Sequence, residues 1–178
     1  GWAPGFWGNR LDEQGLGDHV IGITGQEVTS FTHGHFNAFP LVWRDDLPNH
    51  GAVFPYDKDP VALFEAIRSQ HDADEIIQIN HPRGANISAY FSYVGLNAEE
   101  DQVANMANLS TDWDAIEVFN GGCSGGTPLS DWVGLTNHGY RKTLAGGSDS
   151  HGEHGLIGTP RNWIQVDEAS VRADHQAL

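Results

Sequence analysis

Apolar residues along this chain fall in short runs separated by segments of helical periodicity. Runs typical of buried strands occur at 20–24, 38–43, 76–79, 115–119 and 143–145, and 163–166 closes the pattern. Helical spacing of apolar residues predicts helices over 60–70, 98–109 and 128–138. The first of these has Asp59 as its N-cap and Pro60 at its first position. Residues 1–19 show no period and are predicted to be irregular, whereas 167–178 reads as the start of a helix.

The order of these elements indicates an α/β fold. Predicted strands and helices alternate at least three times, which favours parallel strands joined by helical crossovers, in either an open sheet or part of a barrel. A chain of 178 residues is enough for one domain with a real core. No internal repeat or linker divides it, so we expect a single domain over 1–178, with its core at 20–166.

Composition narrows the partners that this chain can bind. The formal net charge is -15 at pH 7, a field that repels nucleic acid and anionic membrane surfaces. No apolar run is long enough to span a bilayer. The single Cys123 excludes an internal disulfide and a cysteine zinc cage, so a bound metal would need imidazole and carboxylate ligands. The chain begins at Gly1 without a signal peptide and is interpreted as a fragment, so localisation and oligomeric state stay open.

Candidate ligands fall at the ends of the predicted strands. Glu27 follows the first strand, His81 the third and Asn120 the fourth, while Asp149 and His151 follow the fifth. The carboxyl ends of parallel strands share one edge of a sheet, and active sites are assembled there. Residues distant in sequence are therefore expected to converge on one pocket.

The chemistry of these residues is consistent, although each has a simpler explanation. Together with His35, the candidate ligands Glu27, His81, Asp149 and His151 provide three imidazoles and two carboxylates. Such ligands suit Zn, Mn or Fe. Taken singly, Glu27 is more often a cap or a surface charge, and His35 a loop residue. His81 can satisfy a loop carbonyl, and Asp149 can cap a helix. The metal-site hypothesis therefore depends on several candidates lying together at strand ends.

Six short segments resemble the motifs of the PHP (polymerase and histidinol phosphatase) domain metallohydrolases. These segments are GQEVT (25–29), GHFNAF (34–39), NHPR (80–83), EVFNG (117–121), GSDSH (147–151) and GTPR (158–161). They resemble most closely the subgroup named for carbaryl hydrolase. The resemblance covers about residues 20–166, and its motifs occur in the family's order.

The resemblance implies a distorted (β/α)7 barrel that holds two or three divalent ions, Zn, Mn or Fe. It implies hydrolysis of a small, anionic phosphate ester, or of a carbamate or other ester, by a metal-activated water. Arg83, Asn120 and Arg161 would contact the substrate, although either arginine can equally be a surface charge. The implied metal ligands are Glu27, His35, His81, Asp149 and His151.

The sequence departs from the family pattern before Glu27. The opening H-x-H pair and the T-D-H-type motif are absent, and a complete barrel needs roughly 200 residues or more. We therefore expect a barrel that is incomplete at its N-terminus. The alternative is a degenerate PHP-like module that binds metal or ligand without catalysis, and a third reading is an acidic scaffold with accidental histidines. The GCSG segment at 122–125, which with Gly126 matches the G-x-S-x-G pattern, is interpreted as a glycine-rich loop and not as a nucleophile elbow. No phosphate-loop or dinucleotide motif supports another enzyme class.

Overall fold

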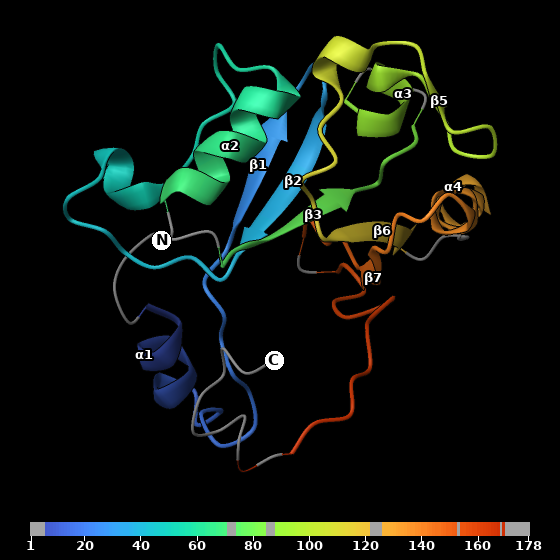
Figure 1. The fold of residues 1–178 in the computed structure, drawn as a ribbon. Helices are drawn as coiled ribbons and strands as arrows, with labels where there is room; N and C mark the ends of the chain where they lie inside the picture. The colour runs from blue at the N-terminus through green and yellow to red at the C-terminus, as the bar shows by residue number, and fades with distance from the viewer. Residues whose placement is uncertain are drawn as a thin grey trace.

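A computed structural model describes residues 6–70, 74–84, 88–121, 126–152, 154–167 and 169. Its main sheet has five strands in the order β1-β2-β3-β6-β7, and a small ribbon pairs β4 with β5 (Figure 1). The strands are β1 (Gln26–Ser30), β2 (Gly34–Phe39), β3 (Ile76–Asn80), β4 (Leu96–Asn97), β5 (Gln102–Val103), β6 (Ala115–Asn120) and β7 (Thr143–Gly147). The α-helices are α1 (Phe6–Glu13), α2 (Pro60–Gln70), α3 (Tyr90–Val94) and α4 (Gly126–Asn137), and short 3-10 turns cover Pro48–Gly51 and Met106–Asn108.

The main sheet is open and mixed, so the expectation of a (β/α)7 barrel is wrong. β1 pairs antiparallel with β2, and β2 pairs antiparallel with β3. β3, β6 and β7 are parallel, and the described strands do not close into a barrel. Only residues 31–33 separate β1 from β2, a link too short for the crossover that parallel strands need. The alternative of an open sheet, favoured equally by the alternation of elements, is the one observed.

One face of this sheet carries the hydrophobic core. Val28, Phe36, Ile79 and Ile116 lie opposite one another across β1, β2, β3 and β6, and each is at most 1% exposed. Helices α2 and α3 cover this face, and α4 lies beside β6 (Figure 1). Burial of each large side chain contributes about 1.5–3 kcal/mol relative to exposure. The helical side chains packed here include Leu63, Phe64, Ile67, Tyr90, Phe91 and Leu135.

Five predicted elements are confirmed, and their ends follow simple chemistry. These elements are α2, β3, β6, α4 and β7. The Oδ1 atom of Asp59 accepts a hydrogen bond of 2.8 Å from the backbone N–H of Ala62, as expected for an N-cap. After α4, Gly139 has a φ of 92°, a left-handed conformation that ends helices and that glycine adopts without steric cost.

The predicted strand at 20–24 is not a strand, and pairing starts two residues later at Gln26. In the β1–β2 register, Gln26 lies opposite Ala38, so continued pairing would set Thr24 opposite Pro40. Proline has no N–H to donate to a ladder. The apolar run is partly exposed as a result. The second predicted strand, at 38–43, is likewise displaced, to Gly34–Phe39.

Three further predictions of local structure are wrong. The helix predicted over 98–109 is replaced by the β4–β5 ribbon and a 3-10 turn. Asn97 Oδ1 does accept a bond from the N–H of Glu100, at 3.3 Å, but it stabilises a turn in which Asp101 has a left-handed φ of 51°. Residues 6–13, predicted to be irregular, form α1, and 163–166 form no strand. The helix predicted at 167–178 lies almost wholly outside the described residues.

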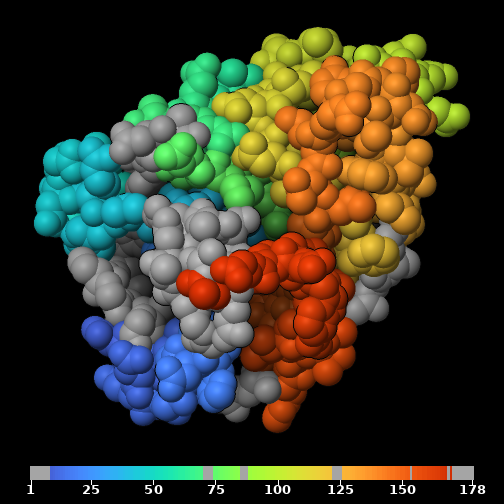
Figure 2. Space-filling model, turned by 60° about the horizontal axis from the view of Figure 1, so that its bottom comes forward, coloured from blue at the N-terminus to red at the C-terminus, as the bar shows by residue number. Residues whose placement is uncertain are grey.

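The segment that follows β7 and the N-terminal segment lie on the same side of the molecule. Figure 2 brings this side forward and shows the segment after β7 (red) arching over a hollow near the N-terminal residues (blue). Among the described residues, none of the helices combines the length and the apolar character needed to cross a bilayer.

Candidate metal centre

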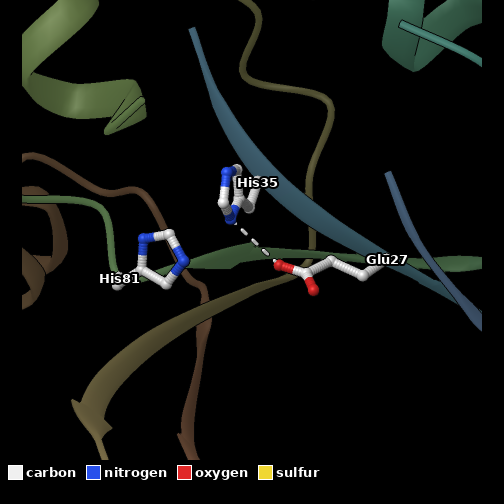
Figure 3. Close-up of side chains that lie close together, drawn as sticks. All are labelled: Glu27, His35 and His81. Carbon is white, nitrogen blue, oxygen red and sulfur yellow. Dashed lines mark ion pairs between the residues drawn. The ribbon is translucent and has the colours of Figure 1, made fainter. Parts of the chain in front are cut away.

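Glu27, His35 and His81 come together on the polar face of the sheet. Glu27 lies on β1, His35 on β2, and His81 directly follows β3. One ligand atom from each lies within 4.8 Å of the other two. The Nδ1 atom of His35 is 3.1 Å from Glu27 Oε1, and the rings of His35 and His81 are 4.7 Å apart. Figure 3 shows a nitrogen of each ring facing the Glu27 carboxylate.

Period-two alternation places these ligands opposite the core. In β1 and β2, Glu27 and His35 point away from the face that buries Val28 and Phe36. His81 has a φ of 26°, in the left-handed region that residues other than glycine rarely adopt. Such strained residues cluster at functional sites, because the surrounding structure must hold them in place.

The surroundings of His35 favour its uncharged form. Burial lowers the pKa of His35, and the neighbouring His81 lowers it further, while Glu27 and Asp149 oppose this shift. A neutral imidazole has a lone pair for a metal ion. Its Nε2 atom is buried and has no hydrogen-bond partner among the described groups. Nδ1, which faces Glu27 and His81, is therefore the nitrogen placed to bind an ion.

Three amide side chains form a network beside Glu27. Asn37 lies opposite Glu27 in the β1–β2 register, and Gln78 lies opposite Asn37 on β3. Asn80 Nδ2 donates to Asn37 Oδ1 at 3.0 Å and lies 3.4 Å from Glu27 Oε1. Gln78 Nε2 in turn donates to Asn80 Oδ1 at 2.9 Å. This network restrains the Glu27 carboxylate and pairs polar groups that would otherwise be buried without partners.

Glu117 is a buried carboxylate between the strands. It is 4% exposed, and burial raises its pKa, partly offset by hydrogen bonds from the backbone of His81 and the side chain of Asn120. Its Oε2 atom accepts from the His81 N–H at 2.6 Å and from Asn120 Nδ2 at 3.0 Å. Glu117 thus links the ends of β3 and β6.

Asp149 and His151 lie beside the triad but outside it. Asn120 Nδ2 is 3.2 Å from Asp149 Oδ2, so Asn120 bridges Glu117 and Asp149. His151 is exposed, with its Nδ1 atom 3.6 Å from Asp149 Oδ1. Both residues line a cleft of about 500 Å³, whose described walls also include Glu27, Asn37, Gln78, Asn80, His81, Glu117, Asn120, Gly147, Ser148 and Ser150. Four of the five predicted ligands thus line one cleft, and His35 is not part of its described lining.

The two arginines predicted to contact substrate do not line this cleft. Arg83 forms a two-pronged ion pair with Asp131 on α4, at 2.7 and 2.9 Å, and donates to the carbonyl of Leu96. Arg161 contacts Thr159 and the ring of Trp163. Asn120, the third predicted substrate contact, does line the cleft.

The predicted site residues did not include Glu117, Asn37, Gln78 or Asn80. Their signal is present in the sequence: 76–80 reads IIQIN and 115–119 reads AIEVF, each with polar residues inside an apolar strand. Alternation puts Gln78 and Asn80 on one face of β3. A carboxylate or amide within a buried strand needs a partner, and that need distinguishes these positions from surface charges.

The residues present fit a divalent transition metal. Two imidazoles and one carboxylate are borderline ligands that accept Zn, Mn or Fe, and three protein ligands leave one coordination position open. The triad is the one group of three or more candidate ligands that meets this spacing in the described part of the chain. Comparisons with family models, with curated proteins and with solved structures gave no match to this chain.

Proposed function

We propose that this chain forms the metal centre of a metal-dependent hydrolase that acts on phosphate esters. The observation that carries the proposal is the triad of Glu27, His35 and His81, of which Glu27 and His81 line a polar cleft. Structural zinc sites use four protein ligands, whereas catalytic sites use three and keep a position for water or substrate. The resemblance to PHP-domain proteins supports the same class of chemistry.

A bound ion would act as a Lewis acid and make a bound water far more acidic than bulk water. Glu27 and His35 would hold the ion from the hairpin, and His81 would hold it from the end of β3. Asp149 and His151, which line the same cleft, are proposed as ligands of a further ion.

The charge of the cleft bears on its substrate. The described lining contains three carboxylates and no lysine or arginine. An anionic ester therefore depends on the metal for charge neutralisation, because a bound cation is the largest local charge. Turnover of phosphate esters should accordingly disappear entirely when the metal is removed.

Elemental analysis and turnover assays of the same samples test this proposal. The chain is incubated with Zn²⁺ or Mn²⁺, desalted, analysed for metal and assayed with p-nitrophenyl phosphate, bis-p-nitrophenyl phosphate and p-nitrophenyl acetate. We expect bound metal and phosphoester hydrolysis, both lost in His81→Ala and retained in His138→Gln, which changes an exposed histidine after α4. Metal binding without turnover of any substrate would favour the non-catalytic module, and the absence of bound metal would refute the metal centre.

A further inference from the structure

One oxygen of Glu117 accepts hydrogen bonds from two residues that lie at the ends of different strands. Oε2 accepts from the backbone N–H of His81, after β3, and from the side chain of Asn120, at the end of β6. Asn120 then reaches Asp149, after β7. A carboxylate that accepts N–H donors forms charge-assisted bonds, which are shorter and stronger than neutral ones. The short 2.6 Å bond to His81 matches this description.

We propose that Glu117 is a positioning residue for the metal ligand His81, an inference that rests on the proposed metal centre. His81 has a strained backbone, with a φ of 26°. The bond to its N–H fixes the peptide that carries the imidazole and so directs the ring toward Glu27 and His35. Residues that orient ligands without touching the ion commonly affect metal affinity strongly.

The packing around Glu117 distinguishes positioning from direct ligation. Glu117 is not part of the triad whose atoms meet the metal spacing. Its second oxygen, Oε1, lies against Gly147, where an added Cβ would collide with it. Gly147 thus leaves room for the carboxylate. A Gly147→Ala substitution must displace the Glu117 side chain and should reproduce the loss caused by its removal.

A comparison of alanine and glutamine at position 117 tests the role. Both bonds use the same oxygen, so the single amide oxygen of glutamine can accept both. We expect Glu117→Ala to weaken Co²⁺ binding by about 10–100-fold. Glu117→Gln should weaken it by only about fivefold, since a neutral acceptor replaces a charged one. If Glu117 binds the ion itself, glutamine should be as harmful as alanine. Glu65→Gln, on the exposed side of α2, is the matched control.

A double-mutant cycle and an amide measurement complete the test. In a His81→Ala background, whose residual affinity is titrated at higher Co²⁺ concentration, Glu117→Ala should change that affinity by no more than about twofold, because the imidazole that Glu117 positions is already absent. An undiminished effect in that background would overturn the proposal. In the metal-free chain, the ¹H–¹⁵N signal of the His81 amide should lie far downfield in the parent and in Glu117→Gln, and shift upfield in Glu117→Ala.

The two readouts separate the failure of this inference from the failure of the proposed function. If the parent chain binds no Co²⁺, both the metal centre and the ligand role of His81 are refuted. If Co²⁺ binds but the His81 amide signal is unaffected by Glu117→Ala, only the positioning role is refuted. Thermal unfolding of each variant shows whether loss of affinity follows loss of the fold.

Discussion

The two faces of the main sheet use the same strands for opposite purposes. Along β2, Phe36 and Ala38 are at most 1% exposed in the core, whereas His35 and Asn37, which alternate with them, belong to the ligand triad and the amide network. The core face is sealed by α2 and α3, while the polar face borders a cleft. Because side chains alternate between the two faces of a strand, neighbouring residues of β2 contribute in turn to the core and to the polar site. Substitutions on the two faces should therefore affect different measurements.

The largest effect on stability is expected on the core face. Phe36→Ala removes a ring that is 0% exposed and contacts Phe64 and Tyr90, so the free energy of unfolding should fall by about 3–5 kcal/mol. Urea denaturation measures this loss. Asn37→Ala, one residue along on the polar face, is the comparison. An equal loss there would contradict the separation of the two faces.

Metal should stabilise the chain through the polar face alone. At a free Zn²⁺ concentration one hundred times the Kd, binding to the folded state adds about 2.7 kcal/mol to the free energy of unfolding. Thermal unfolding with and without Zn²⁺ detects this gain, and a chelator should reverse it. In Glu27→Gln, which weakens a ligand of the triad, the gain should be largely lost. A full gain in that variant would exclude Glu27 as a ligand.

Tyr90 introduces a titratable group into the core face. Burial raises the pKa of Tyr90 from 10.0 to about 12. Because the folded value is the higher one, this contribution to stability is complete below pH 10 and is lost as the pH rises toward 12. At pH 11 the loss is about 1.4 kcal/mol. Urea denaturation at pH 8 and pH 11 should show it, and Tyr90→Phe should remove this part of the pH dependence.

The smallest effect is expected at a helix end that belongs to neither face. Asp59→Ala deletes the N-cap of α2 and should lower the free energy of unfolding by about 1 kcal/mol. Zn²⁺ affinity should be unchanged, because Asp59 caps the helix and does not line the cleft. A loss of metal binding in this variant would show that general destabilisation can imitate a defect of the triad.

Local patterns predicted the elements that depend on near neighbours, and failed where distant residues decide. The helices α2 and α4 and the strands β3, β6 and β7 follow from periodicity and end signals. The start of β1 depends instead on Pro40 across the hairpin. The antiparallel hairpin itself excluded the barrel. Asn97 shows a further limit, since its hydrogen bond has the same local form in a turn and at a helix start.

The candidate site was partly predictable for the same reason. Strand-end placement correctly brought His81, Asn120 and Asp149 to one cleft. Sequence position alone could not show that Glu27 and His35 lie within strands. Nor could it show that Arg83 forms an ion pair with Asp131 and so points away from the cleft lining. The role of Glu117 was missed because it depends on a contact with a backbone N–H that is 36 positions away.

The three-residue link between β1 and β2 also has a consequence for the order of assembly. Hairpins joined by short turns form within about 1–10 μs, whereas pairings between distant segments form late because loop closure is costly. The Glu27–His35 half of the centre is therefore available early in folding. His81 joins only after the chain has returned through α2 to place β3 beside β2. Two of the three proposed ligands are therefore in place before His81 arrives. The ion should accordingly stabilise the completed fold and should not direct the pairing of the strands.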